Sequence, residues 1–374
     1  MTDEHIPMQP EIRDPQAPVN MLGGFGQTGT EAPVPGSPAP APGLSLSDFE
    51  DDGGRDIEPE ELDAIGYVDP LNVRPRTSSR VLCVVFGVLM LILAAVAWWL
   101  GVRTESGQSY DDMVESTFAT IIPGWLSAML GIGTHLMVLI VSVIITVAAL
   151  AIAAVRKRWW LIGQMVVFAA ICGCASLLKY VLPRPFIIKT VIDNAHNSAP
   201  SGHTIMGMVC GVMLVCAVPV AWRWVASLVA MAWGLFVGLA VVCGKWHRPT
   251  DAVMSMLIVG GVALIVLAFT RTSGMDALGT RRSSAGVQVI ASVAVTAGLF
   301  ACVFAGYVIW QVIPGLTISA AWAKTDAVYS AILLIAGMNA VVHGVVLALR
   351  QLTASPLSRI GLVGEPPAPP KTRG

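Results

Sequence analysis

Two histidines, each beside residues that suit the start of a helix, give this sequence its clearest chemical signal. His203 closes the string Ala199-Pro-Ser-Gly-His203, and His247 is followed four residues later by Asp251. Residues four apart meet on one face of a helix, provided that the first turn extends back to the histidine. A carboxylate on one imidazole nitrogen fixes the tautomer and leaves the other nitrogen free to attack, as in a catalytic triad. The spacing therefore predicts His247 as a nucleophile that Asp251 orients.

Helix starts also supply the anion-binding part of this chemistry. Ser201 is placed as the N-cap of a helix, and Gly202 lets a phosphate approach the free backbone N–H groups behind it. Pro249 suits the first turn of the next such helix. Four cations lie near these two starts in the sequence: Lys179, Arg184, Lys245 and Arg248. The pattern is typical of a site that holds an oxyanion.

Membrane-spanning helices are the elements that must position these residues. The 374 residues are 55% hydrophobic and only 13% charged, against about 25% charged in an average soluble domain, which disfavours a soluble enzyme. Runs of about 20 apolar residues, the length that crosses a bilayer, lie at about 81–102, 134–155, 159–180, 202–221, 224–243, 251–270, 288–312 and 327–349. The sequence therefore predicts an all-α bundle with eight spans. A weaker stretch between about 111 and 132 is expected to be interfacial or re-entrant.

Basic residues in the short loops predict the orientation of the bundle. If the spans alternate, most of them fall on one side: Arg74, Arg76, Arg80, Arg156, Arg158, Arg223, Arg271, Arg281, Arg282 and Arg350. Because Lys and Arg favour the cytoplasmic side, we expect both termini in the cytoplasm and the two histidine motifs outside the cell membrane. Five cations break this rule and need another reason: Lys179, Arg184, Lys189, Lys245 and Arg248.

The two ends of the chain differ from the apolar part. Residues 1–72 hold 15 acidic and 2 basic side chains, and half of the 24 prolines lie within 1–75. Such a segment buries too little apolar surface to offset its chain entropy, so we expect a disordered, acidic cytoplasmic tail at 1–75. A short cytoplasmic tail is expected at 351–374. The seven cysteines lie in apolar runs, which indicates packing residues and not a disulfide framework.

The histidine motifs, with Lys179 and Arg184-Pro185 before them, resemble the three signature blocks of the type 2 phosphatidic acid phosphatase (PAP2) superfamily, which also includes vanadium haloperoxidases. The resemblance covers about residues 134–270. It implies a six-helix PAP2-like membrane core at 81–270, with two additional spans at 288–349. It also implies that His247 forms a phosphohistidine, that Asp251 orients it and that His203 protonates the leaving oxygen. The implied phosphoryl ligands are Lys179, Arg184, Ser201 and the Gly202 N–H group.

Two positions depart from the family pattern. The first block has arginine seven residues after its lysine, where this chain has Phe186, and the third block has Ser-Arg where this chain has Ala240-Val241. A phosphoryl transition state needs several fixed cations, and one lost donor can cost about 10²–10³ in rate. We therefore expect Lys245 or Arg248 to replace the missing arginine.

The resulting hypothesis is an integral-membrane lipid phosphatase that acts on a lipid phosphate or pyrophosphate at the outer face. Polyprenyl pyrophosphate, phosphatidic acid and phosphatidylglycerol phosphate all suit such a site. A lipid phosphotransferase and a non-catalytic lipid-phosphate binding or transport protein are the alternatives. The expected partners are the membrane and the lipid phosphate within it, and we expect no nucleic acid, cofactor or metal. The oligomeric state stays open.

Three other histidines are expected to have no catalytic part. His135 precedes an apolar run and is interpreted as a packing or interface residue, and His196 as a solvated loop residue. His343 lies deep in the last span, where an ionisable group is a candidate functional residue. A neutral His343 that bonds to a backbone carbonyl is the preferred interpretation.

Overall fold

The computed structural model describes residues 74–188, 197–276, 284–316, 318 and 320–354. The two predicted tails lie outside these residues, apart from 74–75 and 351–354. Residues 351–354 belong to a helix and not to a tail, because the last helix continues to Ala354.

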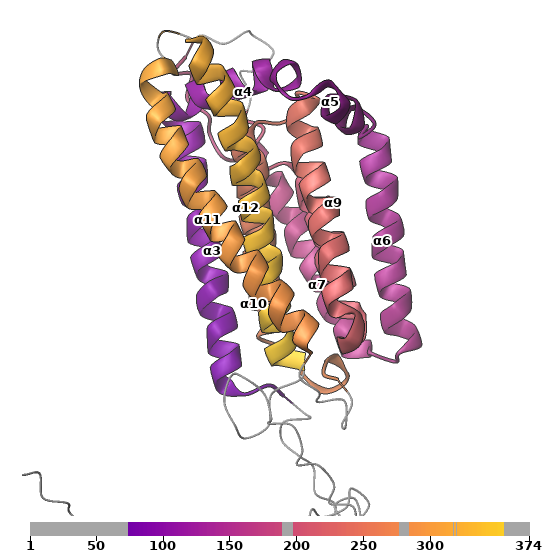
Figure 1. The fold of residues 1–374 in the computed structure, drawn as a ribbon. Coiled ribbons are helices and arrows are strands. Elements are labelled where there is room, and N and C mark those ends of the chain that lie inside the picture. The colour runs from indigo at the N-terminus through magenta and orange to yellow at the C-terminus, as the bar shows by residue number, and fades with distance from the viewer. Residues whose placement is uncertain (1–73, 189–196, 277–283, 317, 319, 355–374) are drawn as a thin grey trace, which may run out of the picture. The chain divides into compact units, whose positions relative to one another are not determined.

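The described part of the chain is helical throughout and contains no strand. Each of the eight predicted spans is a helix (Figure 1): α3 (Thr77–Arg103), α6 (His135–Val155), α7 (Trp159–Ala175), α8 (Gly202–Ala217), α9 (Arg223–Cys243), α10 (Pro249–Leu267), α11 (Ala285–Leu316) and α12 (Ala321–Ala354). Short 3-10 turns extend or join them at η2 (Ser176–Tyr180), η4 (Val220–Trp222) and η5 (Thr272–Gly274).

Helix α8 has only 16 residues, whereas the other seven are long and apolar enough to cross a membrane. Its two ends nevertheless match those of α6. His203 at its start lies 3.1 Å from His135 at the start of α6, and Arg156, which follows α6, donates to the Ala217 carbonyl at its end. Helix α8 therefore runs parallel to α6 and covers the same depth.

The weaker stretch between spans one and two forms two helices, α4 (Glu105–Ile121) and α5 (Gly124–Gly131), bent by 108° at Pro123. Thr104 caps α4 by accepting a hydrogen bond from the Gly107 N–H. Figure 1 shows both helices lying across one end of the bundle. The bend agrees with the expected interfacial or re-entrant piece.

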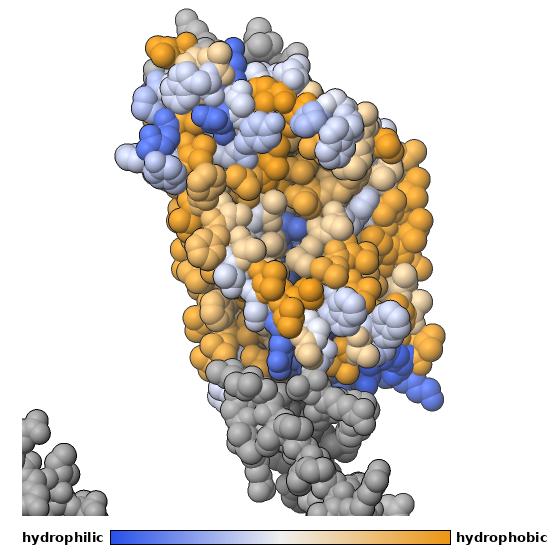
Figure 2. Space-filling model, viewed as in Figure 1, coloured by the Kyte–Doolittle hydropathy of each residue, from blue (hydrophilic) through white to orange (hydrophobic). Residues whose placement is uncertain are grey.

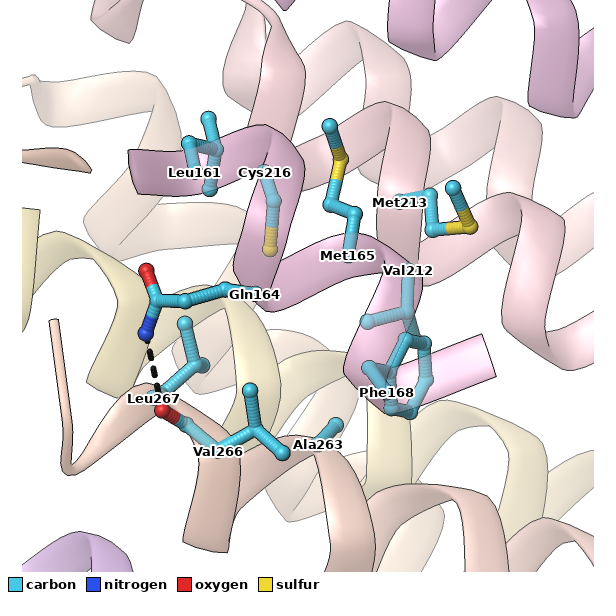
Figure 3. Close-up of a pocket in the computed structure, with 10 residues that line it drawn as sticks. All are labelled: Leu161, Gln164, Met165, Phe168, Val212, Met213, Cys216, Ala263, Val266 and Leu267. Atoms are coloured by element: carbon cyan, nitrogen blue, oxygen red, sulfur yellow. Dashed lines mark hydrogen bonds between the residues drawn. The ribbon is translucent and has the colours of Figure 1, made fainter. Parts of the chain in front are cut away.

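Helix α10 is the centre of the bundle, since it packs against α3, α7, α8 and α12, and α11 packs on α12. Paired glycines allow close backbone contact between helices: a Cβ added to Gly87 would lie 2.9 Å from the Gly261 carbonyl, and one added to Gly298 would lie 2.7 Å from the Gly337 carbonyl. Between α7, α8 and α10 only a void of about 20 Å³ remains, where Gln164 donates to the Val266 carbonyl (Figure 3).

Apolar side chains cover the flank of the bundle, and hydrophilic residues gather toward its two ends (Figure 2). Large hydrophobic side chains in the middle parts of the helices are exposed, such as those of Val147, Phe300 and Val303. An exposed apolar band of this kind marks a membrane-facing surface. The chain is a multi-pass membrane protein.

Candidate active site

The start of α8 provides an open anion-binding position. Ser201 caps the helix, and its Oγ accepts hydrogen bonds from the N–H and the hydroxyl of Thr204. A Cβ added to Gly202 would meet nothing within 4 Å, so the space beside the first turn is open. The free N–H groups of this turn and the positive end of the helix dipole favour an anion.

His247 and Asp251 meet, but not on one face of a helix. Helix α10 begins at Pro249, so His247 lies just before it and the first turn does not extend back to the histidine. The contact of 3.3 Å between His247 Nδ1 and Asp251 Oδ2 forms because the carboxylate turns back toward the helix start. The same oxygen accepts the Arg248 N–H at 3.1 Å, as in a capping box.

Ser198, which the sequence analysis did not single out, completes the support of Asp251. Its Oγ donates to Asp251 Oδ2 at 2.6 Å and accepts from Arg248 Nη1 at 2.9 Å. Asn197 fixes this loop, because its side-chain amide donates to the carbonyls of Leu182 and Ala199. Asp251 is thus fully buried, with its orientation set from both sides.

Two carboxylates of α4 also reach the start of α10. Glu115 lies 3.5 Å from Arg248 Nε, and Asp111 accepts hydrogen bonds from the N–H and the hydroxyl of Thr250. Burial, with a contribution from Asp251, raises the pKa of Asp111 to about 7, and burial also raises the pKa of Glu115. Neither carboxylate is among the predicted site residues, because both belong to a separate helix.

Arg184 lies near these carboxylates and has N–H donors that no described residue accepts. Gln108 donates to the Pro185 carbonyl at 2.8 Å, which fixes the backbone next to Arg184. The two terminal nitrogens of Arg184 are buried and have no hydrogen-bond partner among the described residues. Burial and the neighbouring Arg248 lower the pKa of Arg184. Because an unpaired buried guanidinium is costly, this position suits an incoming phosphate.

His203 lies between two other histidines. Its Nε2 is 3.1 Å from Nδ1 of His135, and its ring centroid is 6.1 Å from that of His247. His135 also stacks on Trp246, with ring centroids 3.7 Å apart. His135 therefore packs as interpreted, and in addition a hydrogen bond joins it to a predicted catalytic residue. The signal available in the sequence was its position at the start of α6.

Residues 158–275 match the protein-family model described as PAP2 superfamily. The chain carries a PAP2 superfamily domain. The match begins at the start of α7 and includes both histidine motifs, whereas α3, α4, α6, α11 and α12 lie outside it. No curated protein and no solved structure matches the chain significantly.

The two departures from the family pattern occupy different places in the PAP2 domain. Phe186 is 66% exposed, and Val241 is buried, with its carbonyl accepting the N–H groups of Trp246 and His247. Arg248, 3% exposed, is engaged by Ser198 and Glu115.

The two lysines lie apart from the buried part of the site. Lys245 is exposed in the turn before α10, where its φ is 58°. Lys179 is half-buried in η2, with its Nζ 5.3 Å from the Tyr180 ring centroid.

The remaining histidines and carboxylates add no metal centre. No group of three or more His, Cys, Asp or Glu residues that could hold a metal occurs within the described residues. His343 is buried in α12, and its Nδ1 forms a hydrogen bond of 3.0 Å with the Asn339 carbonyl oxygen. The preferred interpretation of His343 as a carbonyl-bonded histidine is confirmed. His196 lies outside the described residues.

Proposed function

We propose that the protein is an integral-membrane lipid phosphatase that hydrolyses a lipid phosphate or pyrophosphate. The observation that carries the proposal is the His247–Asp251 contact beside Arg184, whose terminal nitrogens have no partner among the described residues. An oriented imidazole and an unsatisfied guanidinium are the nucleophile and the anion ligand that phosphoryl transfer needs. The PAP2 domain supports phosphatase-type chemistry.

In the proposed reaction, Nε2 of His247 attacks phosphorus while the bond between phosphorus and the leaving oxygen breaks. His203 donates a proton to that oxygen, and Asp251 stabilises the charged imidazole through Nδ1. Water then attacks the phosphohistidine, His203 accepts its proton, and inorganic phosphate leaves. Arg184, Ser201 and the Gly202 N–H group hold the phosphoryl oxygens. Arg248 keeps Ser198 and Glu115 in place, and Lys179 and Lys245 attract the anion from the rim.

A lipid is the proposed substrate because the site lies at one end of a membrane bundle. The phosphate of a lipid lies at the interface, where α8 and α10 begin, while its chains stay in the bilayer. Polyprenyl pyrophosphate, phosphatidic acid and phosphatidylglycerol phosphate all present such a phosphate. The alternatives are transfer to an acceptor alcohol, which would use the same phosphohistidine, and binding without turnover.

The proposed orientation places the site outside the cell membrane. Arginines contact groups at the opposite end of the bundle: Arg80 donates to the Ala268 carbonyl, Arg156 to Ala217 and Arg158 to Ser273. Such a cluster favours the cytoplasmic side. This supports cytoplasmic termini and an extracytoplasmic site.

Phosphate release from purified protein tests the proposed activity. The three lipid phosphates are supplied in detergent micelles with EDTA, and protein quenched with base, in which phosphohistidine is stable, is examined for phosphate on His247. We expect release from at least one lipid, which falls by about 10⁴-fold or more in His247→Ala. Loss of phosphate from the lipid only with an added acceptor alcohol, with the phosphoryl group recovered on that alcohol, would favour the transferase. No loss of phosphate from any of the lipids would contradict the proposed phosphatase.

Cysteine labelling in intact cells tests the orientation. Ser116 is exposed on α4 at the site end, and Arg271 is exposed at the opposite end. In a background in which exposed Cys174 is replaced, an impermeant maleimide should label Ser116→Cys in intact cells and Arg271→Cys only after lysis. The reverse pattern would invert the proposed topology.

A further inference from the structure

A cavity on the other side of α10 from α8 has no part in the chemistry described above. Its volume is about 500 Å³, within the range of small-molecule sites. Its walls come from α3, α4, α10, α11 and α12, and of these only α10 lies within the PAP2 match. The two C-terminal helices therefore build a space that the PAP2 domain alone does not form.

The depth of the cavity matches one leaflet of a bilayer. Its wall on α3 runs from Leu93 to Gly101, and Leu93 lies ten residues before Arg103, the last residue of that helix. At about 1.5 Å per residue this is about 15 Å, half of the hydrocarbon thickness of about 30 Å. Leu257 on α10 gives the cavity an apolar lower wall. A hydrocarbon chain from the leaflet next to the site fits this depth.

The rim of the cavity carries hydroxyl groups and no charge. None of its lining residues is Asp, Glu, Lys or Arg, and the polar side-chain groups are the hydroxyls of Thr104, Ser106, Tyr110 and Thr250 and the indole N–H of Trp310. Arg103, the nearest cation in the sequence, lies over the rings of Trp98 and Trp99. A phosphate would lose its hydration here without a counter-charge, whereas an alcohol exchanges hydrogen bonds with the rim.

We propose that this cavity binds a hydrocarbon chain of an uncharged lipid alcohol, with the hydroxyl at the rim. That class includes the alcohol which the proposed hydrolysis releases. The statement that the bound alcohol is the reaction product rests on the proposed function. The statement that the cavity binds an uncharged lipid alcohol does not.

Helix α4 connects this cavity to the phosphate site. Gly107 and Tyr110 line the cavity, and Tyr110 bonds to α12 through the Ala327 carbonyl. On the adjoining face, Gln108 holds the Pro185 carbonyl and Asp111 holds Thr250. A bound alcohol therefore stabilises the helix that positions Arg184.

Photo-crosslinking of the full-length protein tests the binding without any turnover. The probes are a diazirine-bearing diacylglycerol and the matching phosphatidic acid, each added to His247→Ala protein in phosphatidylcholine nanodiscs so that neither is converted. We expect the diacylglycerol to label residues 93–101 and 306–313, and unlabelled diacylglycerol to compete. Phosphatidic acid should label these residues at least about tenfold less. Equal labelling by both probes, or labelling spread around the whole apolar belt, would overturn the proposal.

A cavity-filling variant provides the second arm. A Cβ added to Gly306 meets nothing within 4 Å, so Gly306→Phe places a ring in the cavity without a backbone clash. Gly163 on α7 is equally open but lines a different groove, which makes Gly163→Phe the matched control. Diacylglycerol labelling should fall at least about tenfold in the first variant and stay unchanged in the second. Undiminished labelling in a folded Gly306→Phe protein would contradict the site, and the probe comparison stands even if that variant does not fold.

Discussion

Both ends of the bundle bury arginine, but Arg223 and Arg350 at one end donate to the chain through terminal nitrogens, whereas those of Arg184 at the other end have no partner among the described residues. At the end where α8 stops, Arg223 pairs with Asp276 at 2.7 Å, and Arg350 donates to the carbonyls of Cys216 and Gly274. Carbonyls at a helix C-terminus carry negative partial charge and suit a guanidinium. At the end where α8 starts, the backbone presents N–H groups, and the terminal nitrogens of Arg184 have no partner among the described residues.

The difference shows that helix direction decides whether a buried arginine stabilises the fold or is available to bind an anion. Arginine beside helix C-termini is paired with a carboxylate and with carbonyls of the chain, and these contacts tie neighbouring helices together. Arginine beside helix N-termini adds to their positive potential, and the terminal nitrogens of Arg184 are left to bind an anion, because no described residue accepts their hydrogen bonds. We therefore expect changes at the first end to alter stability and changes at the second end to alter activity.

The largest effect is expected from removing the carboxylate that pairs with Arg223. Asp276→Ala leaves the fully buried Arg223 charged and without its carboxylate, which should cost about 3–5 kcal/mol of unfolding free energy. Phosphate release per folded molecule should not change. Thermal unfolding in detergent, with activity normalised to folded protein, measures both.

A matched double variant separates charge from packing at this end. Arg223→Met combined with Asp276→Leu removes both partners, so it should recover most of the stability lost in Asp276→Ala. If the double variant is as unstable as the single one, the contact matters through its shape and not through charge. A loss of activity in the folded Asp276→Ala protein would erase the distinction between the two ends.

The next largest effect is expected at the end where α8 starts, which we call the open end. Arg184→Ala removes the guanidinium that is free to bind phosphoryl oxygens, so phosphate release should fall by about 10²–10³-fold. The melting temperature should hardly change, because no residue that the structure describes accepts a hydrogen bond from the two terminal nitrogens.

Arg103→Ala is the control for Arg184, since Arg103 lies at the same end but contacts only the rings of Trp98 and Trp99 in the described contacts. Kinetics with a lipid phosphate should show near-normal rates for this variant. Equal losses in both variants would mean that general positive potential, and not a specific ligand, drives the reaction.

The sequence predicted the spans well because each is a long apolar run, and such runs have few alternatives in a membrane. It also predicted Ser201 as a cap, because the N-cap preference depends on neighbouring residues alone. It failed where the structure depends on contacts distant in the chain. Glu115 and Asp111 reach the start of α10 from a separate helix, and only packing reveals that they face Arg248 and Thr250.

The roles of two predicted ligands illustrate the same limit. Arg248 was expected to replace a missing family arginine, but it lies between Ser198 and Glu115, and Lys245 is exposed. Sequence spacing placed both beside His247 without indicating the direction of either side chain. Whether each of them binds phosphate stays a prediction.

The smallest effect in this comparison is expected from His135, which acts on the proposed catalytic residues through its hydrogen bond to His203. His135→Phe keeps a ring on Trp246 but removes the hydrogen bond to His203 Nε2. The lost bond should lower kcat about tenfold and leave KM unchanged, because His203 acts on the leaving oxygen and not in binding. His135→Asn places an amide near the Nδ1 position and should restore most of kcat. If the His135→Asn enzyme were slow and the His135→Phe enzyme normal, stacking on Trp246 would be the function of this residue, and the open end would need no third histidine.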